Sequence, residues 1–340
     1  MEKFSLIVHP LSWRDFARII PPVQYFPEKI LKGAARFWPP FQISAIKGLS
    51  SSEGEIEGEL RCCPLTPEHF LDWPVEISLR RIKSAVQSAA KNGAKIAGLG
   101  AWTAVPGERG SALAPELGIP VTTGDSLTIY MALEAVKTAA RERALNWDTA
   151  SIAVLGVTGL SESALACARL LARENRFLTL VVRERGKTDR TVAEILYETG
   201  VAVRVTDQAK EVVRQADVVI AFTANEDAFE EIKPGDFKRG AVLCDVLWPR
   251  NLAQRIAPQG QDLLVIEDGV VALPGTVEMD SAKATLWGCS PSQCPAWMAE
   301  VMILALEKRF EAFSLGRGIG VGQIEEIGRL ALKHGFKLAL

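Results

Sequence analysis

Six short apolar runs between residues 151 and 267, separated by helical or turn-rich stretches, restrict the fold more than any other feature of the sequence. The runs are Ser151–Gly156, Phe177–Val182, Val201–Val205, Asp217–Phe222, Ala241–Val246 and Leu263–Glu267. Runs that are apolar at nearly every position belong to strands covered on both faces, and helices between them make the strands parallel. The pattern therefore predicts an α/β fold with a doubly wound parallel sheet over residues 150–275.

The length of the chain, 340 residues, favours more than one domain, because a single hydrophobic core rarely serves so many residues. Residues 1–149 are predicted to form an α/β substrate domain, in which two strands, Phe41–Ile46 and Glu55–Cys62, pair with each other. Residues 276–340 are expected to return as helices that pack on the N-terminal domain and close a cleft. The clearest helical periods outside the sheet are at Ile77–Lys91, Ser126–Arg143, Pro295–Phe313 and Gly322–His334.

Composition and charge exclude several classes of protein. The net charge of −2 offers no electrostatic basis for nucleic acid, or for an anionic membrane, as the main partner. No stretch reaches the roughly 18 apolar residues of a membrane span, and the start of the chain is interpreted as a buried strand, not a signal peptide. Three distant histidines and six cysteines without a CxxC spacing predict neither a metal site nor a disulfide framework, so we expect reduced thiols in a cytoplasmic protein.

A glycine-containing turn joins the first run to the first helical stretch. It reads Gly156-Val157-Thr158-Gly159. Glycines allow a diphosphate to approach the backbone, and the N-terminus of the following helix faces its negative charge. The turn therefore predicts a Rossmann-type dinucleotide site formed by Gly156, Thr158 and Gly159, and Thr223, directly after the fourth run, completes the expected set.

The residues after the second run bear on the choice of nicotinamide cofactor. Enzymes that use NAD usually place a carboxylate at this strand end, whereas an arginine there accommodates the 2′-phosphate of NADPH. Here the strand ends in Arg183, with Arg185 and Lys187 close behind it. We therefore expect NADPH, while Glu184 leaves NADH possible.

A cysteine near the C-terminal helices is the candidate nucleophile. Cys294 precedes Pro295, and proline favours the first position of a helix, which would make Cys294 the N-terminal cap. Free N–H groups at a helix start stabilise a thiolate. Cys289 lies in the same loop as a rival, and the structural alternative is an inert buried cysteine.

Three further groups of polar residues are candidates for the site. Thr122, Thr123 and Gly124 either cap the helix that follows them or place hydroxyl and N–H groups in the cleft. Asp245 ends the fifth run, at the carboxyl edge where α/β proteins bind ligands. His9 and His334 could carry protons, although a lone histidine is more often structural.

Several segments together resemble the long-chain acyl-[acyl-carrier-protein] reductase family, which is related to glutamyl-tRNA reductase and shikimate dehydrogenase in its dinucleotide domain. The similarity runs nearly end to end. The TTG segment, the P-x-N segment and the HGF end are the most specific parts. The segments that carry it are His9, Phe37-Trp38, Gly98–Thr103, Thr122–Tyr130, Gly156–Gly159, Asp245 with Pro249 and Asn251, Asp268–Val271, Ala299-Glu300, Phe313–Arg317, Glu326–Gly328 and His334–Phe336.

The resemblance implies NADPH-dependent reduction of a fatty acyl thioester, carried by acyl carrier protein or coenzyme A, to the aldehyde through a cysteine acyl-enzyme. Two positions depart from the family pattern. Glu162 stands at the third glycine, and Trp297 stands where the family has its cysteine. Cys294 lies three residues earlier, about one helical turn, so either it substitutes or the covalent step is lost. The alternatives are a noncovalent dehydrogenase like shikimate dehydrogenase and a nucleotide-binding protein without turnover.

Overall fold

The chain forms two compact units, each of which is described by itself. The computed structural model describes residues 1–156, 162–182, 188–223, 229–246, 251–257, 262–267, 269–316 and 318–339. Unit 1 consists of Met1–Leu127, Val270–Gly316 and Glu326–Leu340, and unit 2 consists of Thr128–Gly269 and Arg317–Glu325. Within these ranges no helix is both long and apolar enough to cross a membrane.

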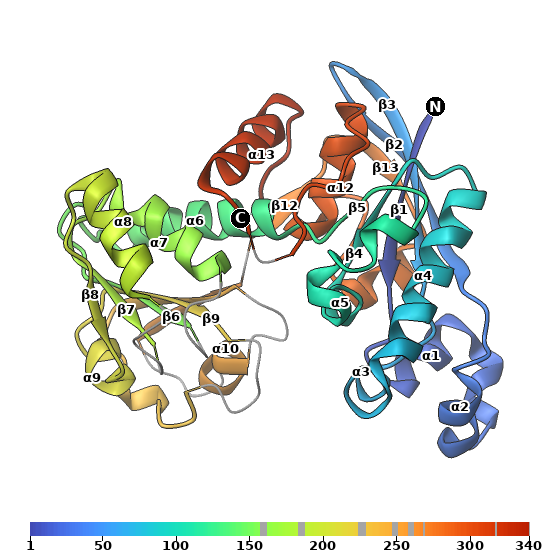
Figure 1. Ribbon diagram of the computed structural model, residues 1–340, viewed down its shortest axis with the longest axis horizontal. Helices are drawn as coiled ribbons and strands as arrows, with labels where there is room; N and C mark the ends of the chain where they lie inside the picture. The colour runs from blue at the N-terminus through green and yellow to red at the C-terminus, as the bar shows by residue number, and fades with distance from the viewer. Residues whose placement is uncertain are drawn as a thin grey trace. The chain divides into compact units, whose positions relative to one another are not determined.

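Unit 2 is built on a parallel sheet of six strands (Figure 1). Its strands are β6 (Ile152–Gly156), β7 (Leu178–Val181), β8 (Arg204–Thr206), β9 (Val218–Phe222), β10 (Ala241–Asp245) and β11 (Leu263–Glu267). They lie in the order β11-β10-β9-β6-β7-β8, and every pair of neighbours is parallel. Numbered along this domain the order is 3-2-1-4-5-6, which is that of the Rossmann fold. The predicted fold class is confirmed.

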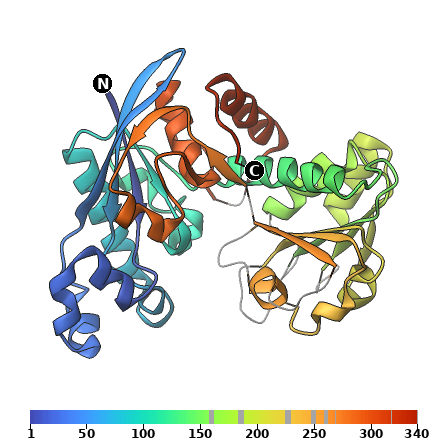
Figure 2. The same cartoon turned by 180° about the vertical axis from the view of Figure 1, so that it is seen from behind.

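Helices cover both faces of this sheet, as the all-apolar strands require. Side chains along β6 alternate between the faces, so that Val154 joins one core and Leu155 the other. The first core contains residues of α6 (Asp125–Glu142), α7 (Glu162–Ala172) and α8 (Asp189–Thr199), and the second contains residues of α9 (Ala209–Val213) and α10 (Asn251–Ile256). Figure 2 shows the same layers from behind.

Unit 1 contains a second six-stranded sheet, of mixed direction. Its order is β13-β2-β3-β1-β4-β5. The predicted pairing of the second and third strands is confirmed as an antiparallel hairpin, whereas β1 is parallel to both β3 and β4. The strands are β1 (Glu2–Val8), β2 (Phe41–Ser51), β3 (Gly54–Cys62), β4 (Ile96–Leu99), β5 (Val121–Thr122) and β13 (Gly275–Glu278).

Two helices pack on this sheet from residues far apart in the sequence. Helix α4 (Val75–Lys91) contributes Ile82 and Val86 to the core that also holds Ile7 of β1. Helix α12 (Ala296–Leu306) contacts β1, β3 and β4, and Val301 lies close to Leu6 around Gly98. Because Leu6 and Ile7 are adjacent on a strand, the two helices cover opposite faces.

The predicted helix at 295–313 is shorter than expected and ends at Leu306, where Lys308 adopts a positive φ of 54°. The other expected helices differ by one or two residues from those observed. Sequence periodicity did not indicate the short helices of unit 1 or its small sheet β14-β12-β15. The remaining elements are α1 (Trp13–Ile19), η1 (Pro21–Tyr25), α2 (Glu28–Ala34), α3 (Pro67–Asp72), η2 (Ala101–Ala104), α5 (Pro106–Arg109), η3 (Ala114–Glu116), η5 (Pro234–Asp236), α11 (Ser281–Ala284), η7 (Thr285–Trp287), α13 (Val321–Lys333), β12 (Val270–Ala272), β14 (Gln293–Pro295) and β15 (Lys337–Leu338).

Candidate functional site

The carboxyl edge of the sheet in unit 2 is where its topology places a dinucleotide. The chain order reverses between β6 and β9, which are neighbours, and ligands of such sheets bind at this point. Gly156 ends β6 opposite Phe222 of β9, and Thr223 follows directly. The strand order and these two residues fit a dinucleotide. The other predicted cofactor residues, Thr158, Gly159, Arg183 and Arg185, lie outside the described residues, and their roles stay predictions.

Asp245 connects three elements at this edge. The Thr223 hydroxyl donates to Asp245 Oδ2 at 2.6 Å, and the same oxygen accepts the N–H groups of Leu252 at 3.0 Å and Ala253 at 3.2 Å. These N–H groups belong to the first turn of α10, where a carboxylate is favoured. Burial raises the pKa of Asp245 to about 6, against the effect of its hydrogen bonds. Asp245 therefore holds β9, β10 and α10 together at the edge.

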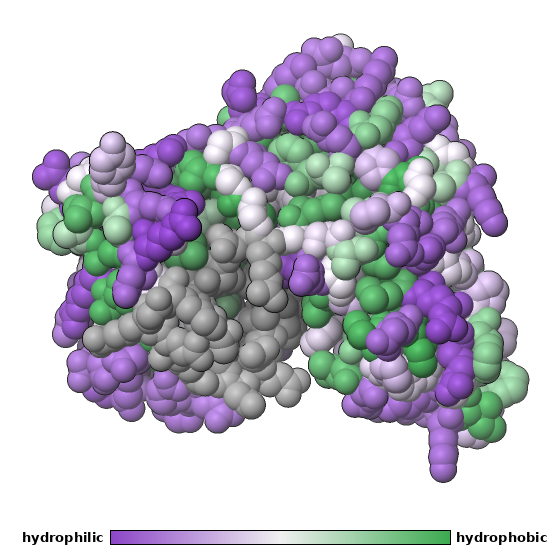
Figure 3. Space-filling view, viewed as in Figure 1, coloured by the Kyte–Doolittle hydropathy of each residue, from purple (hydrophilic) through white to green (hydrophobic). Residues whose placement is uncertain are grey.

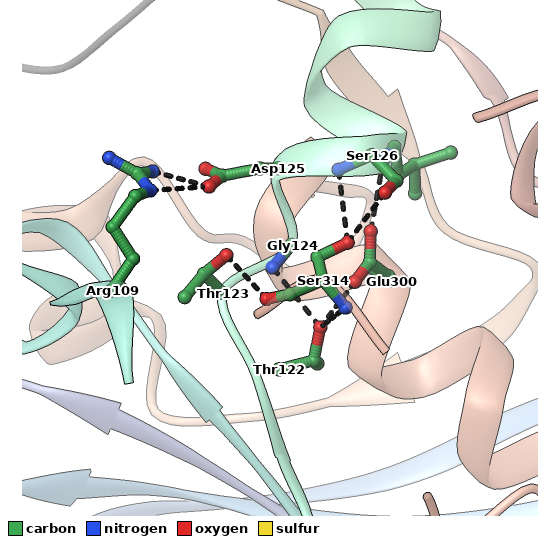
Figure 4. A network of polar contacts seen from close by, with 9 residues as sticks. Arg109, Thr122, Thr123, Gly124, Asp125, Ser126, Glu300 and Ser314 are labelled. Atoms are coloured by element: carbon green, nitrogen blue, oxygen red, sulfur yellow. Dashed lines mark hydrogen bonds and ion pairs between the residues drawn. The ribbon is translucent and has the colours of Figure 1, made fainter. Parts of the chain in front are cut away.

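In unit 1 the predicted Thr122–Gly124 segment meets a buried carboxyl group from α12 (Figure 4). Thr122 Oγ1 donates to Glu300 Oε1 at 2.5 Å, and the N–H of Leu127 donates to Glu300 Oε2 at 3.0 Å. Thr123 Oγ1 donates to the carbonyl oxygen of Ser314 at 2.7 Å. The N–H of Ser314 in turn donates to Thr122 Oγ1 at 2.9 Å. One glutamate thus organises the start of α6 and the loop around Ser314.

Glu300 is the functional candidate that sequence reasoning did not identify as a site residue. Its side chain is fully buried, and this burial raises its pKa to about 7, although the hydrogen bonds from Thr122 and Leu127 act in the opposite direction. A signal was present in the sequence, because Glu300 is the one charged residue in the apolar segment Ala296–Leu306. Charged residues are rarely buried unless they are paired or functional.

The start of α6 carries a second polar contact. Asp125 Oδ2 accepts a hydrogen bond from Arg109 Nε at 2.9 Å, and Arg109 Nη2 also contacts it. The N–H of Ser126 donates to the hydroxyl oxygen of Ser314 at 3.1 Å. Side chains from distant segments therefore satisfy N–H groups in the first turn of α6, which fixes the preceding Thr122–Gly124 turn.

Trp297 fills a space that Gly100 and Gly124 leave open. A Cβ atom built on Gly100 would lie 2.2 Å from Cη2 of the indole ring, and one on Gly124 would lie 2.3 Å from the Cα of Trp297. A Cβ on Gly98 would instead clash with Cγ2 of Val301 at 2.4 Å and would only touch the same ring, at 3.6 Å. Trp297 precedes Glu300 by about one helical turn on α12. The indole of Trp297 and the carboxyl of Glu300, on one face of α12, thus contact residues at the ends of β4 and β5.

Two curated proteins resemble the chain along almost its whole length. The aminotransferase PigE of Serratia sp. is 30% identical over 345 residues, a match that covers 98% of this chain but only 39% of PigE. The long-chain acyl-[acyl-carrier-protein] reductase of Synechococcus elongatus is 27% identical over 351 residues, and the match covers 98% of each protein. The chain is a distant relative of that reductase. No family model matches the chain.

Solved structures are less similar to this chain than the two curated proteins are. The L-tryptophan dehydrogenase of Nostoc punctiforme is 14% identical, with a TM-score of 0.40 and coverage of 97% of this chain and 80% of that one. The shikimate dehydrogenase of Mycobacterium tuberculosis is 16% identical, with a TM-score of 0.31 and coverage of 61% of each chain. These scores are too low to add to what the strand order establishes. The strand order and the reductase relationship place the chain among the NAD(P)-dependent oxidoreductases.

The expectation that Cys294 caps α12 as an activated thiolate is wrong. The N-terminal cap of α12 is Pro295, and Cys294 lies in β14, paired with Val271 of β12. The strand buries the sulfur completely, and burial raises the pKa of Cys294 well above its ordinary value. Burial also raises the pKa of the rival Cys289 to about 12. Whether Cys294 accepts an acyl group stays a prediction.

Both candidate histidines make structural contacts. His9 Nδ1 lies 2.9 Å from the carbonyl oxygen of Pro10, and His9 Nε2 accepts the N–H of Trp102 at 3.2 Å. This arrangement needs a neutral ring, and burial lowers the pKa of His9 to about 4. His334 Nδ1 contacts the Ser51 hydroxyl at 2.9 Å, and its Nε2 contacts Glu307 at 2.6 Å. Among the described residues, no group of three or more potential metal ligands comes together.

Proposed function

We propose that the chain reduces a fatty acyl thioester, bound to acyl carrier protein or coenzyme A, to the fatty aldehyde with NADPH. The observation that carries this proposal is the match to a long-chain acyl-[acyl-carrier-protein] reductase over 98% of both chains. The reaction consumes the thioester, NADPH and one proton, and it yields the aldehyde, the free thiol and NADP⁺. A 340-residue chain with two units has the size for one cofactor domain and one substrate domain.

The proposed roles of the residues follow from their places in the two units. Gly156, Thr158, Gly159 and Thr223 would hold the cofactor, whose nicotinamide supplies the hydride when bound. In unit 1, the Thr122–Gly124 turn is the candidate substrate segment, because Glu300 and Ser314 hold it rigidly. Cys294 is the candidate acyl acceptor, and its burial requires the β12–β14 pair to open before the sulfur can meet a thioester.

One specific observation favours a noncovalent alternative. By the resemblance to the reductase family, Trp297 stands where that family has its cysteine, and burial raises the pKa of the Cys294 thiol well above its ordinary value. A dehydrogenase that reduces a carbonyl compound directly needs no cysteine. A nucleotide-binding protein without turnover is the remaining alternative.

Product analysis tests the proposal. The protein is incubated with NADPH and a panel of acyl-carrier-protein and acyl-coenzyme A thioesters of different chain length, and a long-chain aldehyde is expected. Without NADPH, an acyl adduct visible by intact mass should form and should be absent in Cys294→Ser, whereas Cys289→Ser should keep it. Aldehyde formation that Cys294→Ser leaves unchanged would remove the covalent step. Oxidation of NADPH only with small polar carbonyl compounds would replace the proposal with the dehydrogenase.

Cofactor preference is a separate prediction. NADPH should bind more tightly than NADH, and Arg183→Ala should remove most of the difference, because one charge-assisted contact to the 2′-phosphate contributes roughly tenfold to hundredfold in affinity. Titration of the intrinsic or nucleotide fluorescence measures both affinities. The exposed Arg176 serves as the matched control, since its replacement removes a charge of the same unit. Equal affinity of the unsubstituted protein for both nucleotides would contradict the prediction.

A further inference from the structure

The helices α1, η1 and α2 form a small lobe of unit 1 with its own core. Phe16, Val23 and Leu31 are buried in it, and Trp38 and Phe41 pack against them. Figures 1 and 2 both show α1 and α2 at one end of unit 1, beyond the sheet. This core explains how the lobe holds its shape, and it leaves the outer side of α2 without a partner within the unit.

Helix α2 and the residues directly before and after it expose large apolar side chains. Tyr25 is 80% exposed, Phe26 57%, Ile30 60% and Phe37 77%. Ile30 lies on α2 itself, Phe26 lies in the extended segment just before it and Phe37 in the turn just after it, whereas Leu31 of α2 faces inward. We call Tyr25, Phe26, Ile30 and Phe37 the α2 patch. In Figure 3 hydrophobic residues lie among hydrophilic ones in this part of the molecule.

The α2 patch lies in a stretch of sequence with a net positive charge. Residues 13–37 contain five lysines and arginines against two acidic residues, which leaves a charge of +3 in a chain whose net charge is −2. Lys29 lies on α2 next to Ile30 in the sequence, and Arg36 precedes Phe37 in the turn after the helix. Neither forms an ion pair with a described residue, although the Arg36 guanidinium lies 5.6 Å from the centre of the Phe37 ring. Lys32 differs, because Glu68 and Asp72 neutralise it.

We propose that the α2 patch docks this chain on the surface of an anionic lipid bilayer. Aromatic and aliphatic side chains beside unpaired basic residues are the combination that binds the headgroup region of such a bilayer. The patch lies on a seven-residue helix and the residues directly flanking it, at an end of the unit, and a fluid lipid surface adapts to such a projecting shape without a matching concave partner. Bulky apolar side chains dominate the patch, whereas an acidic protein alone would be recognised mainly through charge.

Vesicle sedimentation tests the proposal with the full chain. Vesicles of equal parts phosphatidylglycerol and phosphatidylcholine should bind the protein, and vesicles of phosphatidylcholine alone should bind it much less. The double substitution Phe26→Ser and Phe37→Ser should lower the partition coefficient by about tenfold or more. Lys29→Gln with Arg36→Gln should lower it by about fivefold for each charge and should weaken its dependence on salt.

Matched controls keep the outcome unambiguous. Tyr197, which is 93% exposed on α8 of unit 2, is replaced by serine and should leave vesicle binding unchanged. Thermal melting should be the same for all variants, because the substituted side chains are exposed. No sedimentation of the unsubstituted protein, or unchanged sedimentation of the Phe26/Phe37 variant, would overturn the proposal. The proposal would also be overturned if the Phe26/Phe37 variant kept its vesicle binding and instead lost binding to an acidic carrier protein immobilised on a column. The assay contains no thioester and no nucleotide, so its result is independent of the proposed reaction.

Discussion

Glu300→Ala is expected to lower the free energy of unfolding by about 3–5 kcal/mol when it is measured near pH 5. The substitution leaves the Thr122 hydroxyl and the Leu127 N–H without their acceptors in a fully buried place, and it also opens a cavity beneath α12. Denaturation in urea, followed by circular dichroism, measures the loss. The exposed Glu198 on α8 is the matched control, and its replacement by alanine should change stability by less than about 0.5 kcal/mol. A loss no larger than that of the control would contradict the structural role of Glu300.

The same residue predicts a pH dependence with a definite sign. Burial raises the pKa of Glu300 in the folded state to about 7 from an ordinary value of 4.5. The folded state therefore holds this proton more tightly, so the stability that Glu300 contributes is fully present below 4.5 and is lost as the pH rises through 7. Over this window the unsubstituted protein should lose up to about 3 kcal/mol relative to Glu300→Gln, which cannot ionise. Parallel stability curves for the two proteins would contradict the prediction.

Gly100→Ala is expected to destabilise unit 1 by about 1–3 kcal/mol, because the added methyl group meets the ring of Trp297. The nearest ring atoms lie 2.2, 2.3 and 2.8 Å from the built Cβ, while the backbone of Gly100, with φ −110°, accepts alanine. In the background of Trp297→Leu the same substitution should cost much less, because the smaller side chain leaves room. A thermodynamic cycle of the four proteins measures the coupling.

Gly124→Ala provides the contrast that makes this cycle specific. Its built Cβ lies 2.3 Å from the Cα and 2.5 Å from the carbonyl oxygen of Trp297, and its φ is +76°. The clash is with backbone atoms, so we expect a loss of at least about 2 kcal/mol that Trp297→Leu does not relieve. If Trp297→Leu relieved both substitutions equally, or neither, the indole would not be what limits the space beside Gly100.

The carboxyl edge of the sheet in unit 2 was the part of the candidate site that could be predicted from the sequence. A Gly156 that ends one apolar run and a Thr223 that ends another reach the same edge of any doubly wound parallel sheet, because that edge collects the carboxyl ends of its strands. Asp245 was placed correctly at this edge, but its partners were not predictable. They include the N–H groups of Leu252 and Ala253, whose position depends on where α10 begins.

The site in unit 1 could not be predicted in the same way, since its contacts join residues far apart in the chain. Thr122 and Glu300 are 178 residues apart, and no periodicity links them. Cys294 shows the opposite failure. Its neighbour Pro295 suggested an activated helix cap, yet pairing of β14 with β12 turned the sulfur into the interior and raised its pKa. Local sequence predicts a helix start, but the dielectric around a thiol depends on everything packed over it.

The sequence by itself determined the elements of unit 2 and their Rossmann order, because apolar periodicity is a local property and the handedness of parallel crossovers leaves few arrangements. The tertiary structure alone decided three things: that Glu300 is buried and hydrogen-bonded, that Trp297 fills the space beside Gly100 and Gly124, and that the α2 patch is left exposed. Each is a statement about burial, and burial depends on contacts between segments that the chain brings together only when it folds.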